Sequence, residues 1–350
     1  MEFGSMDLVV KDPDVALQTY LKMFGTNNIS QVVKLKGLND GLNVVDGYLL
    51  KTTPVNLGIY APRSGSSPMG RYLSTYGEGI NNITLYMGQD EFEQTYLRYR
   101  EKGMKVSPRV LYVGKFSEAV FWLEEEGIQG VPVKFATQCY HGLTIWKDTD
   151  YVDTPQKFEA VEITDQYYMP RVTLGTVMIT VKDWKNQPDI WSDLLSMPII
   201  RTGNISTRED GEVNDGRGNI FIPIKFRFAG KGAINLYCAV NDDAPINKAL
   251  RKRGRTSMYH SICSYIVRDK AHDYWDRLDA AGFAMVDPKP MLNAGDGNGN
   301  YFYFIHPYST HGVLVEIVSA YHMDEQGRFS YDWSDTQVSM VSPDVLVSTP

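Results

Sequence analysis

A chain of 350 residues with a formal net charge of −7 lacks the broad basic face that binding to nucleic-acid phosphates requires. Its length is sufficient for two domains, each with its own core. The sequence contains neither an apolar run long enough to cross a bilayer nor an apolar signal core at its N-terminus. We therefore expect a soluble, cytoplasmic protein that binds neither nucleic acid nor membranes.

The three cysteines, Cys139, Cys238 and Cys263, are scattered and lack metal-type spacing. Two of them lie in strand-like runs, which is typical of buried, reduced thiols, so a reducing compartment is expected. The residues MEFGS before Met6 resemble vector-encoded sequence. We set them aside when predicting the fold.

One pattern occurs four times along the chain. A strand-like run is followed by a polar stop containing Asp, an amphipathic helix and a Gly or Pro breaker. The copies begin at Asp7, Asn81, Thr176 and His260. Because β-rich runs punctuated by Gly and Pro lie between them, the repeating unit is predicted to be βαβββ.

The two halves of the chain are also related to each other. SSPMGRYLSTYGEGINNITLY in the first half parallels DAPINKALRKRGRTSMYHSICSYI in the second, and GIQGVPVKF parallels THGVLVEIV. The connector around residues 141–171 is polar and acidic and has no strong periodicity. We therefore predict an α+β protein with two similar domains, residues 6–155 and 156–350.

One carboxylate lies in the middle of an otherwise apolar strand near the C-terminus. In YFYFIHPYSTHGVLVEIVSAY, residues 301–321, two strand-like runs are joined by a turn that contains Pro307 and Gly312. Leu314, Glu316 and Val318 share one strand face, where water is scarce. An isolated charge there would be costly, so Glu316 should meet a cation, a metal or hydrogen-bond donors, or be protonated.

This hairpin carries a resemblance to a known superfamily. FIHPYSTHGVLVEIV is similar to the last hairpin of methylmalonyl-CoA epimerases and, more widely, of the vicinal oxygen chelate (glyoxalase-type) proteins. The resemblance implies four βαβββ modules forming two domains, each a sheet curved into a half-barrel. It also implies that Glu316 stands at the position of the metal-binding glutamate, and that pairing into a homodimer is possible.

The resemblance places four metal-ligand positions in each domain. In the first half they fall on Ser5, Gly58, Asn82 and Lys134, none of which is a convincing ligand, and an ammonium would repel a cation. The N-terminal domain is therefore expected to be a metal-free scaffold or lid.

In the second half the same positions fall on Thr176, Asn235, His260 and Glu316. His260 and Glu316 would form the core of a site for Mn, Fe, Co, Ni or Zn, with Asn235 offering a carbonyl oxygen. Thr176 departs from the epimerase pattern, which has a histidine there, and from ring-cleaving dioxygenases, which need two histidines and a glutamate. The alternative is a hydrogen-bonded His260–Glu316 pair without metal.

Further histidines and a basic run complete the candidate set. His306 lies on the Glu316 hairpin and could supply a missing ligand or contact substrate, although a turn histidine is the simpler interpretation. Arg251, Arg253 and Arg255 belong to the densest positive run in the sequence. They are either a solvated helix end or a clamp for a carboxylate or the phosphates of a thioester cofactor.

Three functions follow from these features. The first is a metal-assisted isomerase, epimerase or lyase that moves a proton next to a carbonyl of a small organic acid, thioester or aromatic substrate. The second is an extradiol-type ring-cleaving dioxygenase. The third is a metal-free binding protein, or a metal-free enzyme that uses Glu316 and His260 as acid and base.

Overall fold

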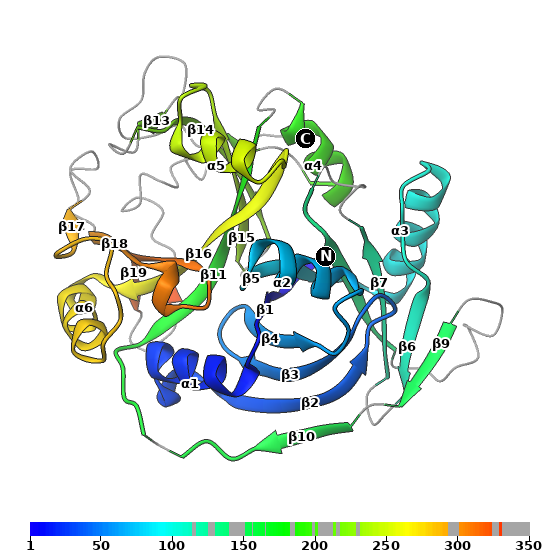
Figure 1. Ribbon diagram of the computed structural model, residues 1–350, viewed down its shortest axis with the longest axis horizontal. Helices are drawn as coiled ribbons and strands as arrows, with labels where there is room; N and C mark the ends of the chain where they lie inside the picture. The colour runs from blue at the N-terminus through cyan, green and yellow to red at the C-terminus, as the bar shows by residue number, and fades with distance from the viewer. Residues whose placement is uncertain are drawn as a thin grey trace. The chain divides into compact units, whose positions relative to one another are not determined.

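The computed structural model divides into two compact units. Unit 1 comprises Met1–Leu21, Ile29–Asp165 and Phe228–Lys231, and unit 2 comprises Lys22–Asn28, Gln166–Arg227 and Gly232–Pro350. The structure describes residues 1–113, 117–124, 130–139, 151–155, 157–164, 166–182, 186–197, 200–201, 213–214, 218–228, 232–292, 301–323 and 329–330. Figure 1 labels the helices and strands of both units.

Unit 1 contains a ten-stranded sheet with the order β10-β2-β3-β4-β1-β5-β8-β7-β6-β9. Its first module is β1 (Glu2–Val9), α1 (Pro13–Phe24), β2 (Gln31–Asn39), β3 (Val44–Lys51) and β4 (Asn56–Pro62). After α2 (Pro68–Tyr76), the second module is β5 (Gly79–Tyr86), α3 (Gln89–Glu101), β6 (Arg109–Val113), β7 (Ser117–Leu123) and β8 (Val133–Cys139). Strands β9 (Tyr151–Pro155) and β10 (Lys157–Val161) extend the two edges. The end of α1 and the η1 turn that follows it (Thr26–Asn28) belong to unit 2.

The first strand begins before Met6, the residue from which the fold was predicted. Strand β1 includes Phe3 and Ser5, which are 1% and 6% exposed, and pairs with β5 from Glu2 onward. Strand β1 includes residues 2–5, with a register shift between Phe3 and Ser5, so excluding these residues from the fold was wrong.

Unit 2 repeats the same order of elements. It contains the third and fourth modules of the chain. The third module is β11 (Val172–Val181), α4 (Gln187–Leu195), β12 (Ile200–Arg201), β13 (Val213–Asn214), β14 (Ile220–Arg227) and β15 (Ala233–Ala239). After α5 (Pro245–Lys252), the fourth module is β16 (Ser257–Val267), η3 (Arg268–Lys270), α6 (Ala271–Ala280), β17 (Met291–Leu292), β18 (Tyr301–Ile305), η4 (Pro307–Ser309) and β19 (Leu314–Met323). The sheet order is β12-β14-β15-β11-β16-β19-β18-β17, and β20 (Phe329–Ser330) pairs with β19.

The two sheets are built with the same connections. In unit 1, β1 is parallel to β4 and antiparallel to β5, and β5 is parallel to β8. In unit 2, β11 is parallel to β15 and antiparallel to β16, and β16 is parallel to β19. The prediction of an α+β fold with four βαβββ modules in two similar domains is therefore confirmed.

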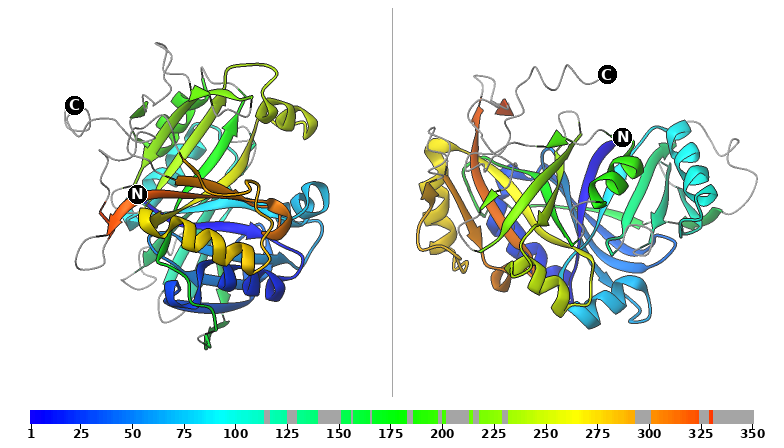
Figure 2. Two further views of the ribbon diagram at one scale, coloured as in Figure 1. Left: turned by 90° about the vertical axis from the view of Figure 1, so that its left-hand side faces the viewer. Right: turned by 90° about the horizontal axis from the view of Figure 1, so that it is seen from above.

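Each sheet is curled, with helices on its outer side (Figure 2). Helix α3 packs through Phe92 and Tyr96 against Phe121 of β7, with ring centroids 4.9 and 5.2 Å apart. In unit 2, the hydroxyl of Tyr303 on β18 donates to the carbonyl oxygen of Ala271 in α6 at 3.2 Å. The helices therefore pack against the outer, convex face of each sheet. Within the described ranges, no helix combines the length and apolar character needed to cross a bilayer.

Candidate functional site

The strand register shows which residues of the two sheets are equivalent. Ser5 pairs with Thr84 in unit 1, as Thr176 pairs with Cys263 in unit 2. Lys134 then lies beside Thr84, and Glu316 lies beside Cys263. The ammonium of one sheet and the carboxylate of the other thus stand at equivalent positions, in agreement with the sequence parallels between the two halves.

A β-bulge lies at the same place in both sheets. Asp7 pairs with Asn82 and Leu8 with Ile80, which leaves Asn81 as the additional residue. Met178 pairs with Ser261 and Ile179 with Tyr259, which leaves His260 additional in the same way. The equivalent of Asn82 is therefore Ser261, whereas His260 matches Asn81. Asn81 and His260 therefore occupy matching bulge positions, as the repeat pattern that begins at these two residues indicates.

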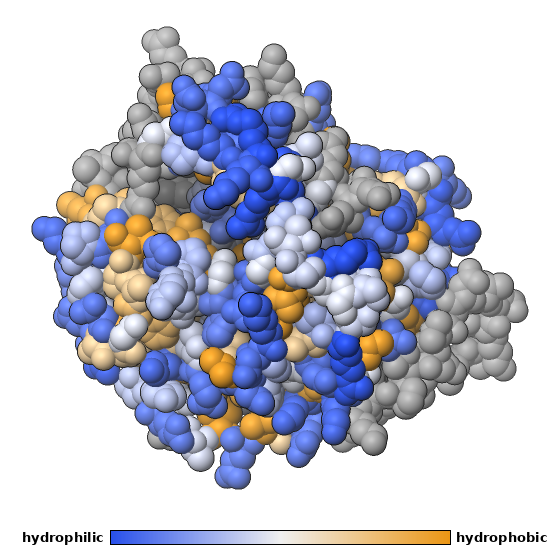
Figure 3. Space-filling view, in the orientation of Figure 1, coloured by the Kyte–Doolittle hydropathy of each residue, from blue (hydrophilic) through white to orange (hydrophobic). Residues whose placement is uncertain are grey.

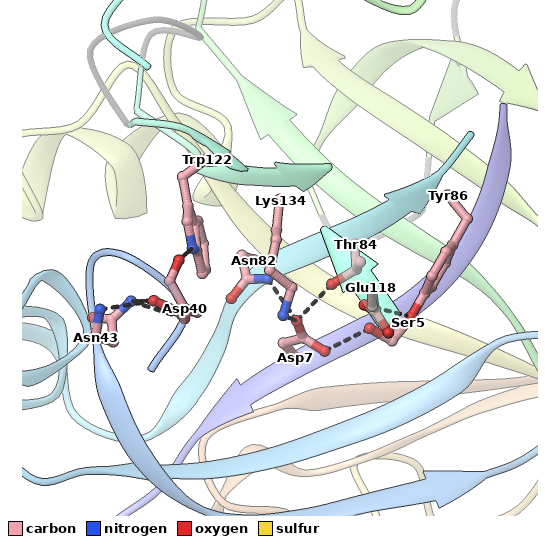
Figure 4. A network of polar contacts seen from close by, with 10 residues as sticks. All are labelled: Ser5, Asp7, Asp40, Asn43, Asn82, Thr84, Tyr86, Glu118, Trp122 and Lys134. Carbon is pink, nitrogen blue, oxygen red and sulfur yellow. Dashed lines mark hydrogen bonds and ion pairs between the residues drawn. The ribbon is translucent and has the colours of Figure 1, made fainter. Parts of the chain in front are cut away.

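The concave face of unit 1 is organised around the buried carboxylate of Asp7, which is 0% exposed (Figure 4). Its Oδ2 accepts hydrogen bonds from Nζ of Lys134 at 2.9 Å, Nδ2 of Asn82 at 2.7 Å and Oγ1 of Thr84 at 2.8 Å. Its Oδ1 accepts a hydrogen bond from Ser5 Oγ at 2.7 Å. Four donors therefore hold one buried anion, which is how a charge is kept inside a protein.

The ammonium of Lys134 lies where the resemblance places a metal ligand. Its Nζ is 5.5 Å from the ring centroids of both Tyr60 and Trp122. Burial by itself lowers the pKa of Lys134, but the nearby carboxylates of Asp7, Asp40 and Glu118 outweigh that effect, so the pKa is raised above its ordinary value. The side chain stays protonated, and the sheet carries its own internal cation.

Two further carboxyl groups lie near this pair, one on the half-buried Glu118 and one on the buried Asp40. Glu118 accepts a hydrogen bond from the Tyr86 hydroxyl at 3.0 Å, and Asp40 accepts one from the backbone N–H of Asn43 at 2.7 Å. Burial raises the pKa of both carboxyl groups, although Lys134 opposes the shift. The network thus extends from the sheet to the loop between β2 and β3.

Sequence reasoning missed Asp7, the centre of this network. A usable signal was present, because Ser5 and Asp7 alternate with apolar residues and so share a strand face. Excluding the residues before Met6 concealed that alternation.

In unit 2, Glu316 lies on the half-buried concave face of β19. Leu314 and Val318 flank it on the same face, while Val315 and Ile317 are buried on the other. Phe304 of β18 pairs with it directly across the strands. Figure 3 shows apolar side chains gathered over β18 and β19. The predicted placement of a carboxylate on an apolar strand face is confirmed by this burial pattern.

The neighbouring strands place hydroxyl and aromatic groups on the same face. Thr176 on β11 pairs with Cys263 on β16, which in turn pairs with Glu316 on β19. The hydroxyls of Thr176 and Tyr265 lie 2.6 Å apart and share a hydrogen bond. Met178, Cys263 and Tyr265 form a buried cluster against which Tyr237 and Val318 pack. The face therefore combines one carboxylate, a hydroxyl pair and an apolar wall.

His260 and Asn235 lie on neighbouring parts of this sheet. The ring of His260 is 6.4 Å from that of Tyr237, and its Nδ1 is 3.2 Å from Oγ of Ser261. Asn235 is 4% exposed, and its buried Oδ1 accepts no hydrogen bond from the residues that the structure describes. A substrate hydroxyl or amide would satisfy such an oxygen.

Only two of the expected ligand positions carry side chains that commonly hold a divalent transition metal. The four positions are Thr176, Asn235, His260 and Glu316, which are one imidazole, one carboxylate and two neutral oxygens. In the described part of the chain, no group of three or more His, Cys, Asp and Glu side chains is arranged to hold a metal. Transition ions of the Mn to Zn series are usually held by several imidazole, thiolate or carboxylate ligands.

The remaining predicted residues lie on helix and turn segments. Arg251 belongs to α5 and donates to the carbonyl oxygen of Asp242 at 2.9 Å, while Arg253 is exposed and Arg255 half-buried just before β16. His306 is exposed, and its Nδ1 accepts a hydrogen bond from the backbone N–H of Tyr308 at 3.1 Å, which caps η4. Three more histidines of the sequence could supply a ligand from a loop. His141 and the side chain of His322 lie outside the described residues, and His311 is in the turn before β19.

Comparisons with known proteins agree with this architecture. No family model matches the chain. The mitochondrial methylmalonyl-CoA epimerase of Dictyostelium discoideum is 25% identical over 144 residues, which are 41% of this chain and 76% of the relative. A mutant of 4-hydroxymandelate synthase from Streptomyces coelicolor superposes with a TM-score of 0.59 and 14% identity over 91% of both chains. Methylmalonyl-CoA epimerase from Mycobacterium tuberculosis aligns with a TM-score of 0.32 and 22% identity, over 41% of this chain and 85% of that one.

Proposed function

Because the chain has the two-domain fold of the vicinal oxygen chelate superfamily, we propose that it is an enzyme that moves a proton next to a carbonyl, as an isomerase, epimerase or lyase. The observation that carries this proposal is the carboxylate of Glu316, set in an apolar strand face of unit 2 opposite Phe304. The proposed substrate is a small organic acid, thioester or aromatic compound.

Glu316 is proposed as the proton acceptor. The C–H bond beside the substrate carbonyl breaks, its proton goes to the carboxylate and its electron pair moves into an enolate. A half-buried carboxylate that shares its strand face with Leu314 and Val318, opposite Phe304, has less water around it than one in solution and can approach a substrate carbon. Return of the proton to the opposite face epimerises the centre, and loss of a leaving group gives a lyase. His260 offers a second proton-transfer group on the same sheet.

The hydroxyl pair is proposed to stabilise the enolate oxygen. Thr176 and Tyr265 are fixed by their mutual hydrogen bond, so their dipoles are oriented before the reaction begins. The wall of Met178 and Tyr237 would hold an apolar or aromatic part of the substrate. An amide or hydroxyl of the substrate would satisfy Oδ1 of Asn235.

A metal-assisted version of this reaction is the alternative. It would need Glu316 and His260 to act as ligands with Asn235, which supplies one carboxylate, one imidazole and one neutral amide oxygen. A ring-cleaving dioxygenase would need a second histidine, where Thr176 instead shares a hydrogen bond with Tyr265. The donor set therefore favours the version in which the side chains themselves move the proton.

Deuterium exchange in the presence of a chelator tests this choice. With methylmalonyl-CoA and phenylpyruvate as probes in D2O, wild-type protein should exchange the hydrogen next to the carbonyl of at least one probe, as measured by mass spectrometry. Its rate and melting temperature should be unchanged by EDTA, since a tightly bound ion would stabilise the folded state. Exchange that EDTA abolishes and Mn²⁺ restores would establish the metal-assisted alternative, and absence of exchange with both probes would count against the proposed reaction.

The basic run is expected to attract anionic substrates. Changing Arg251, Arg253 and Arg255 together to Gln should raise the KM for methylmalonyl-CoA about tenfold at low salt, because three positive charges act together on one anion. The difference should vanish near 1 M salt, where the screening length is about 3 Å. A variant with Arg268, Lys270 and Arg277 changed to Gln carries the same charge change and should keep the wild-type KM. Equal KM values in both variants would identify the run as a solvated helix end.

A further inference from the structure

A cavity of about 320 Å³ lies in unit 1, on a part of its surface that the proposed reaction does not use. Its wall includes Tyr72 and Tyr76 of α2, Asn81 of β5 and Trp122 of β7. Its volume is at the lower end of the roughly 300–1,000 Å³ that small-molecule sites occupy. A single-ring compound fits such a volume, whereas a nucleotide cofactor does not.

The aromatic part of the wall is held in place. Tyr72 and Tyr76 are one helical turn apart, with ring centroids 5.3 Å from each other. The Tyr72 hydroxyl donates to the carbonyl oxygen of Ile80 at 3.1 Å, and Nε1 of Trp122 donates to the carbonyl oxygen of Asp40 at 3.1 Å. Rings fixed in this way can stack on a flat ligand without losing further side-chain freedom.

The charged part of the wall carries a net positive charge. Arg71, Lys105 and Glu124 line the cavity, so two positive charges and one negative charge leave a net charge of +1. Lys105 and Glu124 form an ion pair with 3.3 Å between Nζ and Oε2. The guanidinium of Arg71 donates to the backbone carbonyl oxygen of Ser66. Arg71 forms no ion pair with a described carboxylate, and its guanidinium can bind a carboxylate through two parallel hydrogen bonds.

The same wall contains the side-chain amide of Asn81, which has no hydrogen-bond partner among the described residues. Asn81 is 4% exposed, and its side chain forms no hydrogen bond with any residue in the described ranges. Its polar atoms are not enclosed by protein, so they reach the cavity. The bulge in β5 produces this position, and the matching bulge in β16 produces His260. A nine-tenths buried amide without an internal partner is matched by a ligand hydroxyl or carbonyl.

We propose that this cavity binds a small aromatic carboxylate, with its ring between Tyr72, Tyr76 and Trp122, its carboxylate on Arg71 and a polar ring substituent on Asn81. The site is separate from Glu316 and does not depend on the function proposed for unit 2. It gives the N-terminal domain a binding role of its own in place of a scaffold or lid.

Titration of the full-length protein with 4-hydroxybenzoate tests this site. Calorimetry or ligand-detected NMR should show binding with a Kd of about 1 mM or lower, and Arg71→Met should weaken it at least about tenfold, which is about 1.4 kcal/mol. The uncharged analogue 4-hydroxybenzyl alcohol should bind wild type and Arg71→Met within about twofold of each other. Asn81→Leu should weaken binding of both compounds.

Glu316→Gln is the matched control, because it alters the other concave face and should leave the Kd for 4-hydroxybenzoate unchanged. Binding lost in Glu316→Gln but retained in Arg71→Met would place the ligand in unit 2 and overturn the proposal. The proposal is also overturned if wild type shows no binding at a 4-hydroxybenzoate concentration of about ten times the expected Kd. Arg71 is exposed, so its variant tests the site even where Asn81→Leu does not fold.

Discussion

Glu316→Gln is expected to lower the rate of deuterium exchange next to the substrate carbonyl by about 10² to 10⁴, the usual contribution of a positioned proton acceptor. The amide keeps the size of the side chain and its place between Leu314 and Val318, but it cannot take the proton. Exchange should be measured by mass spectrometry with whichever probe the wild type accepts.

The control for this variant is Asp279→Asn, which makes the same charge change on the exposed side of α6. It should exchange at the wild-type rate, and both variants should melt near the wild-type temperature. An exchange rate in Glu316→Gln above half that of wild type would show that another group accepts the proton. A fall in bound metal that parallels the fall in rate would instead identify Glu316 as a ligand.

Lys134→Met is expected to destabilise the protein by about 3–5 kcal/mol, because it leaves the carboxylate of Asp7 buried without its cation. Nζ of Lys134 is 2.9 Å from Oδ2 of Asp7, and the two side chains are only 9% and 0% exposed. The free energy of unfolding should be measured by urea denaturation at neutral pH.

Two further variants separate the buried charge from the loss of a side chain. Asp7→Asn combined with Lys134→Met removes both charges and should recover most of the loss, since the amide oxygen still accepts from Asn82 and Thr84. Lys105→Met breaks an ion pair whose lysine is 53% exposed, and should cost no more than about 1 kcal/mol. If Lys134→Met costs as little as Lys105→Met, Asp7 is not held as a buried anion.

The same pair predicts a change at alkaline pH. A lysine whose folded-state pKa is raised contributes stability that is fully present below its ordinary pKa of about 10.4 and is lost as the pH rises through the folded-state value. Burial also raises the pKa of Tyr60 and Tyr86, but both tyrosines are present in wild type and in the double variant, so the loss of stability from burying them is common to both. The advantage of wild type over the double variant should therefore shrink above about pH 10.5. An advantage that stays constant to higher pH would contradict a raised lysine pKa.

The sequence by itself determined the architecture, because the signals for it are local. Each module can be identified from alternating apolar residues, a polar stop and a Gly or Pro breaker within about thirty residues. The strand face shared by Leu314, Glu316 and Val318 follows from the two-residue period of a strand alone. These features need no knowledge of what the strands pack against.

Only the tertiary structure decided how the two concave faces differ. Asp7 and Lys134 are 127 positions apart, and neither sequence neighbourhood indicates that they meet. The bulges that displace Asn81 and His260 depend on how two strands pair, which is a property of the pair and not of either sequence run. The cavity in unit 1 depends likewise on where α2 packs. The two-residue period of a strand determines which face a side chain lies on. Which side chains it contacts on that face depends on how strands that are distant in the sequence pair in the folded sheet.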